Sequence, residues 1–147
     1  MTLESDIREV GILMKVVELN EEQVNKIENH LSEFDEKQIK YKIDGKIQIG
    51  IEVDGKIIAG LDACITAYRI LYVSTVFVEA EYRRKGYGTL LMKEMEVRAK
   101  DMGINTIRLD TFGWQGKEFY EALHYEIVGG YENTTDGYAE YFFLKKI

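Results

Sequence analysis

The sequence of 147 residues contains no proline and only one cysteine, and each scarcity excludes a class of protein. Because Cys64 has no second cysteine to pair with, no internal disulfide can form. No apolar stretch approaches the roughly 18 residues that a membrane-spanning helix needs. No charged segment followed by an apolar one opens the chain, which argues against a secretory signal. We therefore expect a cytoplasmic protein that does not bind a membrane.

Histidine is also scarce, and the two histidines do not indicate a metal site. His30 lies off the apolar stripe of its predicted helix, and no set of metal-ligand residues accompanies it, so we predict no metal. Cys64 falls within a predicted strand, where a buried and unreactive thiol is the ordinary expectation. Since no linker, repeat or low-complexity segment interrupts the chain, we predict one domain over residues 1–147.

Negative charge predominates, with 26 acidic against 19 basic residues and a net charge of −7. This balance argues against nucleic acid as a partner, because phosphate backbones are bound through basic surface. It favours a cationic partner, although acidity also serves simply to keep a protein soluble. The basic cluster at residues 83–85 is a local exception. The sequence leaves a monomer and a homodimer both open.

The chain is organised around residues 71–102. Apolar and β-branched residues fill positions 71–78, which predicts a buried strand. Apolar residues then recur at helical spacing, at Leu91, Met95, Ala99 and Met102. This spacing predicts a helix, and Gly103 is placed to end it. Gly86 and Gly88 stand at the entrance of this helix, where backbone N–H groups are unpaired and the helix dipole is positive. The turn therefore predicts a phosphate site, with plain surface turn chemistry as the alternative.

This turn resembles the glycine loop of the GCN5-related N-acetyltransferases (GNAT family), written R/Q-x-x-G-x-G/A, with Arg83, Gly86 and Gly88 at its fixed positions. The dinucleotide fingerprint does not match, because Leu91 stands where its third glycine is required. In the family this loop follows the fourth strand and holds the pyrophosphate of acetyl-CoA. The resemblance implies that acetyl-CoA is bound by Phe77, Val78, Arg83, Arg84, Lys85, Gly86, Tyr87, Gly88, Thr89 and Gln115.

A second motif follows the next predicted strand, residues 107–112. The family pattern N-x-x-A-x-x-F-Y-x-K-x-G-F is met by Phe119, Tyr120 and Tyr125, whereas three positions depart from it: Gly113, Gly116 and His124. Gln115 lies close enough in the chain to replace the asparagine amide that binds the pantetheine arm. The resemblance implies Tyr120 as the catalytic acid, because a phenol of pKa about 10 can donate a proton to the departing thiolate. The alternative is a structural aromatic residue.

The general base is not identified by the sequence. Many family members carry a carboxylate on the central strand, at the position that Tyr72 occupies here. Glu79 and Asp110 are the nearest carboxylates, and each is equally well explained as a charge at a strand end. The missing carboxylate leaves open a second function, a non-catalytic regulator that binds acyl-CoA. A small interaction module without a cofactor is a third.

The remaining pattern agrees with the acyl-CoA N-acyltransferase fold that the resemblance implies. This is an α/β (α+β) fold with a central, mostly antiparallel mixed sheet, one splayed parallel strand pair, and flanking helices. We expect a strand within residues 10–19, a helix from Asn20 to about Phe34, hairpin turns at Asp44-Gly45 and Asp54-Gly55, a helix over 115–123 and a final hairpin from Glu126. Residues 35–42 look irregular, which leaves one helix where the family usually has two.

We therefore predict an acetyl-CoA-dependent N-acetyltransferase. It would transfer the acetyl group directly, in a ternary complex, to a primary amine of a small cationic acceptor. Since Cys64 has no evident histidine partner in the sequence, no covalent acetyl-enzyme is implied.

Overall fold

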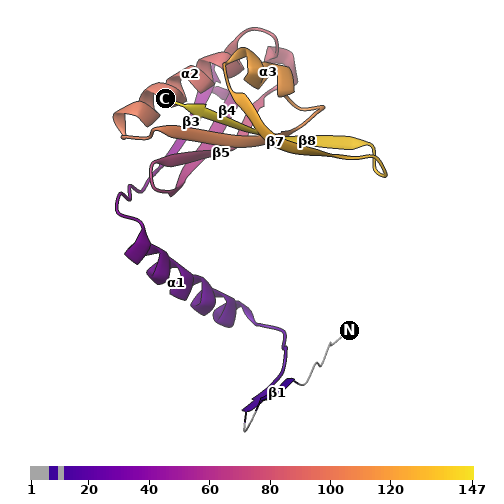
Figure 1. Ribbon diagram of the computed structural model, residues 1–147. Coiled ribbons are helices and arrows are strands. Elements are labelled where there is room, and N and C mark those ends of the chain that lie inside the picture. Colours follow the sequence, from indigo (N-terminus) through magenta and orange to yellow (C-terminus); the bar gives the residue numbers. More distant parts are fainter. Residues whose placement is uncertain (1–6, 10–11) are drawn as a thin grey trace. The chain divides into compact units, whose positions relative to one another are not determined.

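The computed structural model describes residues 7–9 and 12–147, and the chain divides into two compact units, residues 1–40 and 41–147. Each unit is described by itself. The first holds a two-stranded antiparallel sheet, β1 (Ile7–Glu9) and β2 (Ile12–Met14), followed by α1 (Glu21–Gln38) (Figure 1). The prediction of one domain over residues 1–147 stays a prediction.

The start of α1 was predicted correctly and its end was not. The backbone N–H of Gln23 donates to the Asn20 side chain at 2.9 Å, and the Asn20 N–H donates to the Gln23 side chain at 3.0 Å, which forms a capping box. The helix runs past Phe34 to Gln38, because Glu36, Lys37 and Gln38 are good helix formers even without an apolar stripe. Residues 39–45 contain no second helix.

The predicted strand within residues 10–19 is confirmed only in part. Residues 10 and 11 lie outside the described residues, and the strand that is described covers only Ile12–Met14. Val16 and Val17 are exposed and belong to no strand. The loose alternation of apolar residues therefore marked a short strand at Ile12–Met14, which pairs with β1, and continued beyond the end of that strand to Val16 and Val17.

The second unit contains a six-stranded sheet in the order β3-β4-β5-β6-β8-β7. Its strands are β3 (Lys46–Val53), β4 (Lys56–Ala67), β5 (Ile70–Val78), β6 (Thr106–Phe112), β7 (Glu126–Asn133) and β8 (Tyr138–Lys146). All neighbours are antiparallel except β5 and β6, which are parallel because the helix between them returns the chain to the same end of the sheet. The predicted mixed sheet with one parallel pair is confirmed.

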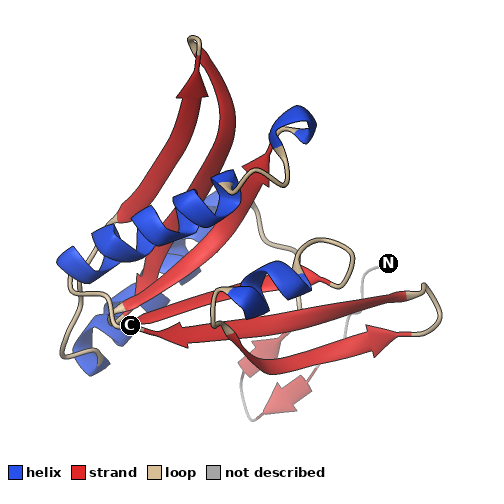
Figure 2. Cartoon of the chain, turned by 90° about the horizontal axis from the view of Figure 1, so that it is seen from above, coloured by secondary structure: helices blue, strands red, loops and turns tan. Residues whose placement is uncertain are grey.

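Two α-helices, α2 (Tyr87–Asp101) and α3 (Lys117–Ala122), lie on the same face of this sheet (Figures 1 and 2), and a short 3₁₀ helix, η1 (Ala80–Tyr82), precedes α2. We call this the inner face. It carries the buried residues of β6, Ile107, Leu109 and Thr111, packed with the buried stripe of α2. The opposite face, which carries Arg108, Asp110 and Phe112 of β6, is called the outer face.

The turns of the second unit follow the sequence signals in two of three cases. Gly103 ends α2 with φ +88°, and the Ile104 N–H donates to the Ala99 carbonyl at 3.0 Å, as predicted. Asp54 and Gly55 both have positive φ and join β3 to β4. Asp44-Gly45 forms no hairpin, because residues 39–45, which lie directly before β3, contain no strand; the Gly45 carbonyl instead accepts the Ile65 N–H at 2.9 Å.

Cys64 is exposed, not buried as predicted. Its neighbour Ala63 takes the buried position on the inner face, because successive side chains of a strand point to opposite faces. Cys64 therefore lies on the outer face, opposite Tyr72 of β5. The sequence showed the strand without showing which of its faces is covered.

Candidate active site

The site is built around a gap between β5 and β6. These strands pair only over Ile70–Tyr72 and Thr106–Arg108, and beyond those residues they separate (Figure 2). The Glu79 N–H donates to the Ile58 carbonyl of β4 at 2.8 Å. Because hydrogen-bonding positions alternate along an antiparallel ladder, the backbone of Val78 turns away from β4 and toward the gap. The backbone of Phe77 turns toward β4, so only Val78 of these two predicted contacts faces the gap.

The glycine turn lies between η1 and α2. Gly86 is the N-cap residue of α2 with φ +86°, and a Cβ added to it would meet nothing within 4 Å. The Leu90 N–H donates to the Gly86 carbonyl at 3.0 Å, which is the first intrahelical bond. Within residues 41–147 the preceding helical N–H groups, those of residues 87–89, have no protein acceptor. The turn therefore presents positive backbone groups that fit an anion.

The three basic residues of the turn have different surroundings. Arg83 donates from Nε to the Val78 carbonyl at 2.9 Å, and its guanidinium lies 5.3 Å from the centre of the Phe77 ring. The Lys85 ammonium lies 5.7 Å from the centre of the Tyr82 ring. Arg84 has φ +60° and makes no side-chain hydrogen bond or ring contact with the described residues. Arg83 thus stabilises the end of β5 through its hydrogen bond to the Val78 carbonyl, whereas the Arg84 side chain is available to bind a phosphate.

Gly88 brings the two sequence motifs together. A Cβ added to Gly88 would lie 3.2 Å from the Phe119 ring of α3 and 3.8 Å from the Val78 side chain of β5. A side chain here would push against the Phe119 ring, so the close approach of α2 and α3 favours glycine, whereas the distance to Val78 is an ordinary van der Waals contact. The end of β5, the start of α2 and the helix α3 therefore meet at one point.

Tyr120 lies on α3, and its side chain contacts three other aromatic side chains. Its ring centre is 5.0 Å from that of Phe119, 5.8 Å from that of Phe143 and 6.1 Å from that of Tyr125. Burial, followed by the negative charge of Asp110, raises the pKa of Tyr120 to about 12. The phenol therefore keeps its proton at neutral pH and can donate it.

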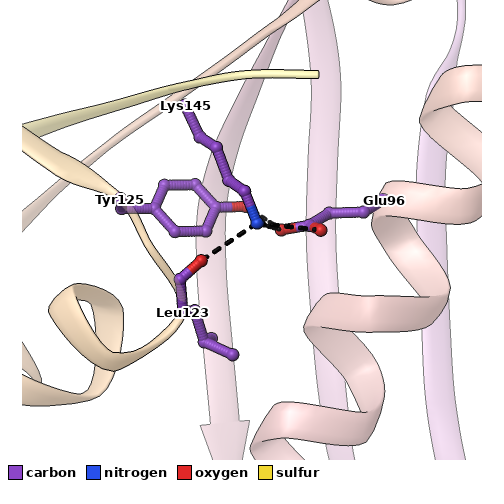
Figure 3. Close-up of polar contacts among 4 residues, drawn as sticks. All are labelled: Glu96, Leu123, Tyr125 and Lys145. Atoms are coloured by element: carbon purple, nitrogen blue, oxygen red, sulfur yellow. Dashed lines mark hydrogen bonds and ion pairs between the residues drawn. The ribbon is translucent and has the colours of Figure 1, made fainter.

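A polar cluster behind Tyr120 attaches α3 to α2 and β8 (Figure 3). The Tyr125 hydroxyl donates to Glu96 of α2 at 2.9 Å, and the Lys145 ammonium donates to both oxygens of Glu96 at 2.9 and 3.1 Å. Lys145 also donates to the Leu123 carbonyl at 2.9 Å. Burial, and then Glu96, raises the pKa of Tyr125. Glu96 and Lys145 were not predicted from the sequence, because residues 49 positions apart give no local signal.

Of the two carboxylates considered as a base, Asp110 is the one at the gap. The Tyr72 hydroxyl donates to Asp110 Oδ2 at 2.9 Å. Tyr72 belongs to the last residue pair of β5 and β6, and Asp110 lies two residues further along β6. A carboxylate from the neighbouring strand therefore stands beside the position where the family often has one. Glu79 lies at the end of β5, where its backbone N–H is hydrogen-bonded to β4.

Three further positions of the second motif, Gln115, Gly116 and His124, lie in the segments on either side of α3. Gln115 accepts the Phe112 N–H on its side-chain oxygen at 3.1 Å and donates its own N–H to the Phe112 carbonyl at 3.0 Å. Its amide oxygen is thus used within the turn. A Cβ at Gly116 would lie 3.3 Å from the Tyr120 ring. His124, where the family has glycine, adopts φ +66°.

Two features are absent from the described residues. No helix among them is long and apolar enough to cross a membrane. The same part of the chain contains no group of three or more histidine, cysteine, aspartate or glutamate side chains placed to hold a metal ion.

Comparisons with known proteins agree with this architecture. The model of the acetyltransferase (GNAT) family matches residues 13–125. The crystal structure of an acetyltransferase from Bacillus cereus ATCC 14579 is 24% identical, with 91% of this chain and 98% of that chain covered and a TM-score of 0.86. A putative acetyltransferase from Agrobacterium tumefaciens is 21% identical, with the same coverage and a TM-score of 0.77. A putative streptothricin acetyltransferase from Bacillus anthracis str. Ames, in complex with acetyl coenzyme A, is 19% identical, with 76% and 67% covered and a TM-score of 0.64. No curated protein matches the sequence significantly.

Proposed function

Because the chain belongs to the acetyltransferase (GNAT) family, we propose that it transfers the acetyl group of acetyl-CoA to a primary amine of a small cationic acceptor, directly and in a ternary complex. The family, the fold and the enzyme class, an acetyl-CoA-dependent N-acetyltransferase, were predicted correctly. The acceptor, the direct transfer and the roles of single residues are our proposals.

The meeting of three segments at the gap carries the proposal. Gly88 lies next to both Val78 and Phe119, and Tyr120 follows Phe119 on the same helix. A ligand with its phosphates on the start of α2 and its arm in the gap would extend toward Tyr120. The fit is supported by the free N–H groups of residues 87–89 and by a solved structure of the same fold that holds acetyl coenzyme A.

Acetyl-CoA supplies a thioester, and the residues of this chain would bind it, orient it and move protons. Residues 87–89 and Arg84 hold the pyrophosphate, and the Val78 backbone orients the pantetheine arm. The acceptor ammonium first loses a proton, for which Asp110 is the candidate base. The amine nitrogen would then bond to the carbonyl carbon while the carbon–sulfur bond breaks, and Tyr120 would give its proton to the leaving thiolate. The second proton released by the nitrogen would return to the Tyr120 phenolate, which restores the acid.

Direct transfer is supported by the surroundings of Cys64. This thiol lies on β4 opposite Tyr72 and has no histidine partner among the described contacts. A covalent route would need an activated nucleophile next to a base.

A thiol-release screen with acetyl-CoA tests the function. Polyamines, aminoglycosides, amino acids and peptide N-termini are supplied as acceptors, and calorimetry measures acetyl-CoA binding separately. We expect cationic amines to release coenzyme A fastest. Binding without release would indicate the non-catalytic regulator, and faster release with neutral or acidic acceptors would contradict the acceptor class.

A further inference from the structure

The outer face carries a cluster of aromatic rings that the chemistry above does not use. Phe112 and Trp114 stack, with ring centres 5.9 Å apart and planes 4° apart. Tyr138 meets Phe112 edge-on at 5.6 Å, and Tyr131 lies 6.2 Å from Tyr138. We call these four residues the aromatic platform. They come from β6, the turn after it, and the β7–β8 hairpin.

The platform is open and firmly held. Trp114 is 75% exposed and Tyr131 is 47% exposed. The two hydrogen bonds between Gln115 and Phe112 fix the turn that carries the indole. Contiguous exposed aromatic surface commonly marks a binding site, because it remains in water only at a cost in free energy.

Two carboxylates accompany the platform on the outer face. In the β6–β8 pair, Asp110 lies opposite Phe142 and Phe112 lies opposite Glu140, so the carboxylates are diagonal neighbours roughly 7 Å apart. Burial and then Asp110 raise the pKa of Tyr72, and Glu140 contributes to the same rise. Both carboxylates are therefore within electrostatic reach of the Tyr72 hydroxyl.

The basic residue of this patch, Arg108, already makes a cation–π contact with the ring of Tyr72. The Arg108 guanidinium lies over the Tyr72 ring, 4.5 Å from its centre. Glu140 interacts with the hydroxyl of Tyr131, which lies opposite it in the β7–β8 pair. The patch therefore combines carboxylates with ring faces, and both attract cations.

The gap connects this patch with the inner face. The glycine turn and α3 belong to the inner face, whereas Asp110 points to the outer face. Asp110 accepts the Tyr72 hydroxyl at 2.9 Å, and Tyr72 belongs to the last residue pair before β5 and β6 separate, so Asp110 lies beside the gap. A ligand on the outer face could therefore present a nitrogen at the gap while acetyl-CoA occupies the inner side. This arrangement would allow both substrates to be bound together.

We propose that the acceptor is an elongated alkylammonium that lies on the outer face, with its reacting amine beside Asp110 and its carbon chain along Phe112 to Trp114. This inference rests on the proposed function. Two residues along a strand span about 6.6 Å, and the stacked rings add 5.9 Å. A second cationic group at the far end of the acceptor would reach the exposed indole. Neutral or anionic acceptors would not be attracted to the carboxylates or to the rings.

Trp114 is the single tryptophan of the chain, so its fluorescence reports on the platform directly. In the absence of acetyl-CoA, 1,8-diaminooctane should give a saturable change in fluorescence. We expect 1-aminopropane to bind at least about 10-fold more weakly, since it does not reach the indole, and 1,8-octanediol to give no change. An equal response to the diol would overturn the proposal, because the platform would then bind alkyl chains irrespective of charge.

Variants link this binding to turnover. Asp110→Asn keeps the reporter and should abolish the fluorescence response, and it should lower kcat/KM for the diamine by about 10- to 100-fold. Trp114→Ala should raise KM for the diamine by about 2- to 30-fold, and Trp114→Phe should retain most of the affinity. Affinity for acetyl-CoA should stay the same in all three. Glu52→Gln, which removes the same charge from an exposed position on β3, is the matched control.

The outcomes separate this inference from the proposed function. If amines release thiol and both Asp110→Asn and Trp114→Ala keep the parent KM, the outer-face site is wrong and the function stands. If no amine releases thiol, the function fails, and the fluorescence titration still decides whether the platform binds a cation. A change of oligomeric state in Trp114→Ala, measured by sedimentation without a change in KM, would instead identify the platform as an interface between copies.

Discussion

The two proposed binding regions differ in how their residues are distributed along the chain. The glycine turn is one run, residues 83–89, and its ligand groups are backbone N–H groups at the start of α2. The outer-face site draws Asp110 and Trp114 from β6 and its turn, and Glu140 from β8. One is basic and depends on local backbone conformation, whereas the other is acidic and depends on strand register. We therefore expect changes in one region to leave the ligand of the other unaffected.

The largest effect is expected for Gly86→Glu, which should abolish acetyl-CoA binding. The added carboxylate would stand where phosphate must meet the backbone, at a position with φ +86° and open space around it. Gly55→Glu is the matched control, since Gly55 has φ +79° and equally open space in the β3–β4 turn. Calorimetry with acetyl-CoA measures both, and the diamine response of Trp114 should survive in both. An unchanged affinity in Gly86→Glu would remove the main argument for the site.

Tyr120→Phe should lower kcat by about 10²- to 10³-fold, because a positioned general acid typically contributes that much. The ring and its contacts with Phe119 and Phe143 remain, so the dissociation constant for acetyl-CoA should change little. The loss should shrink with an acyl donor whose thiol is more acidic. Tyr41→Phe, which removes an exposed phenol and keeps the ring, serves as the control. Full activity of Tyr120→Phe at saturating substrates would make the phenol structural.

The pH dependence of stability offers a separate test of the environment of Tyr120. Its pKa is raised by burial and then by Asp110 from 10.0 to about 12, so the folded state holds this proton more tightly than the unfolded state. The resulting stability is fully present below pH 10 and is lost as the pH rises toward 12. Urea unfolding at pH 9 and pH 12 should show a fall that is smaller in Tyr120→Phe by about 2 kcal/mol. Identical falls in both proteins would mean that the phenol is not buried.

Arg83 and Arg84 should respond differently to salt. Arg84→Gln should weaken acetyl-CoA binding by about 3- to 10-fold at low salt and less at high salt, because an exposed charge is screened. Arg83→Gln should weaken it at all salt concentrations, since the Arg83 Nε bond to the Val78 carbonyl also shapes the end of β5. Lys100→Gln, at the far end of α2, is the control of equal charge. Parallel salt curves for Arg83→Gln and Arg84→Gln would contradict the distinction.

The smallest effect is expected for His124→Gly. His124 follows α3 in the left-handed conformation with φ +66°, and the Tyr125 N–H closes the helix end on the Tyr120 carbonyl at 3.1 Å. Glycine adopts this conformation without strain, so the free energy of unfolding should rise by about 0.5–1 kcal/mol. Ala122→Gly, within α3, should lower it by a similar amount. Denaturant unfolding measures both, and destabilisation by His124→Gly would show that the imidazole makes a stabilising contact.

Local signals in the sequence were sufficient for much of the fold. The capping box at Asn20 and Gln23, the turn at Asp54-Gly55 and the helix end at Gly103 each depend on a few neighbouring residues. The same holds for the glycine turn at the start of α2. The signals failed where only one part of the pattern was present, as at Asp44-Gly45, which has turn residues but no strand directly before them.

The sequence by itself determined the family, the order of most elements and the place of the glycine turn, because these depend on residues that are close together in the chain. The tertiary structure decided which face of β4 is covered, and so that Cys64 is exposed. It also decided that Val78, not Phe77, faces the gap, and that Asp110 stands beside Tyr72. Strand register and sheet faces set these relations, and they join residues that no spacing in the sequence brings together.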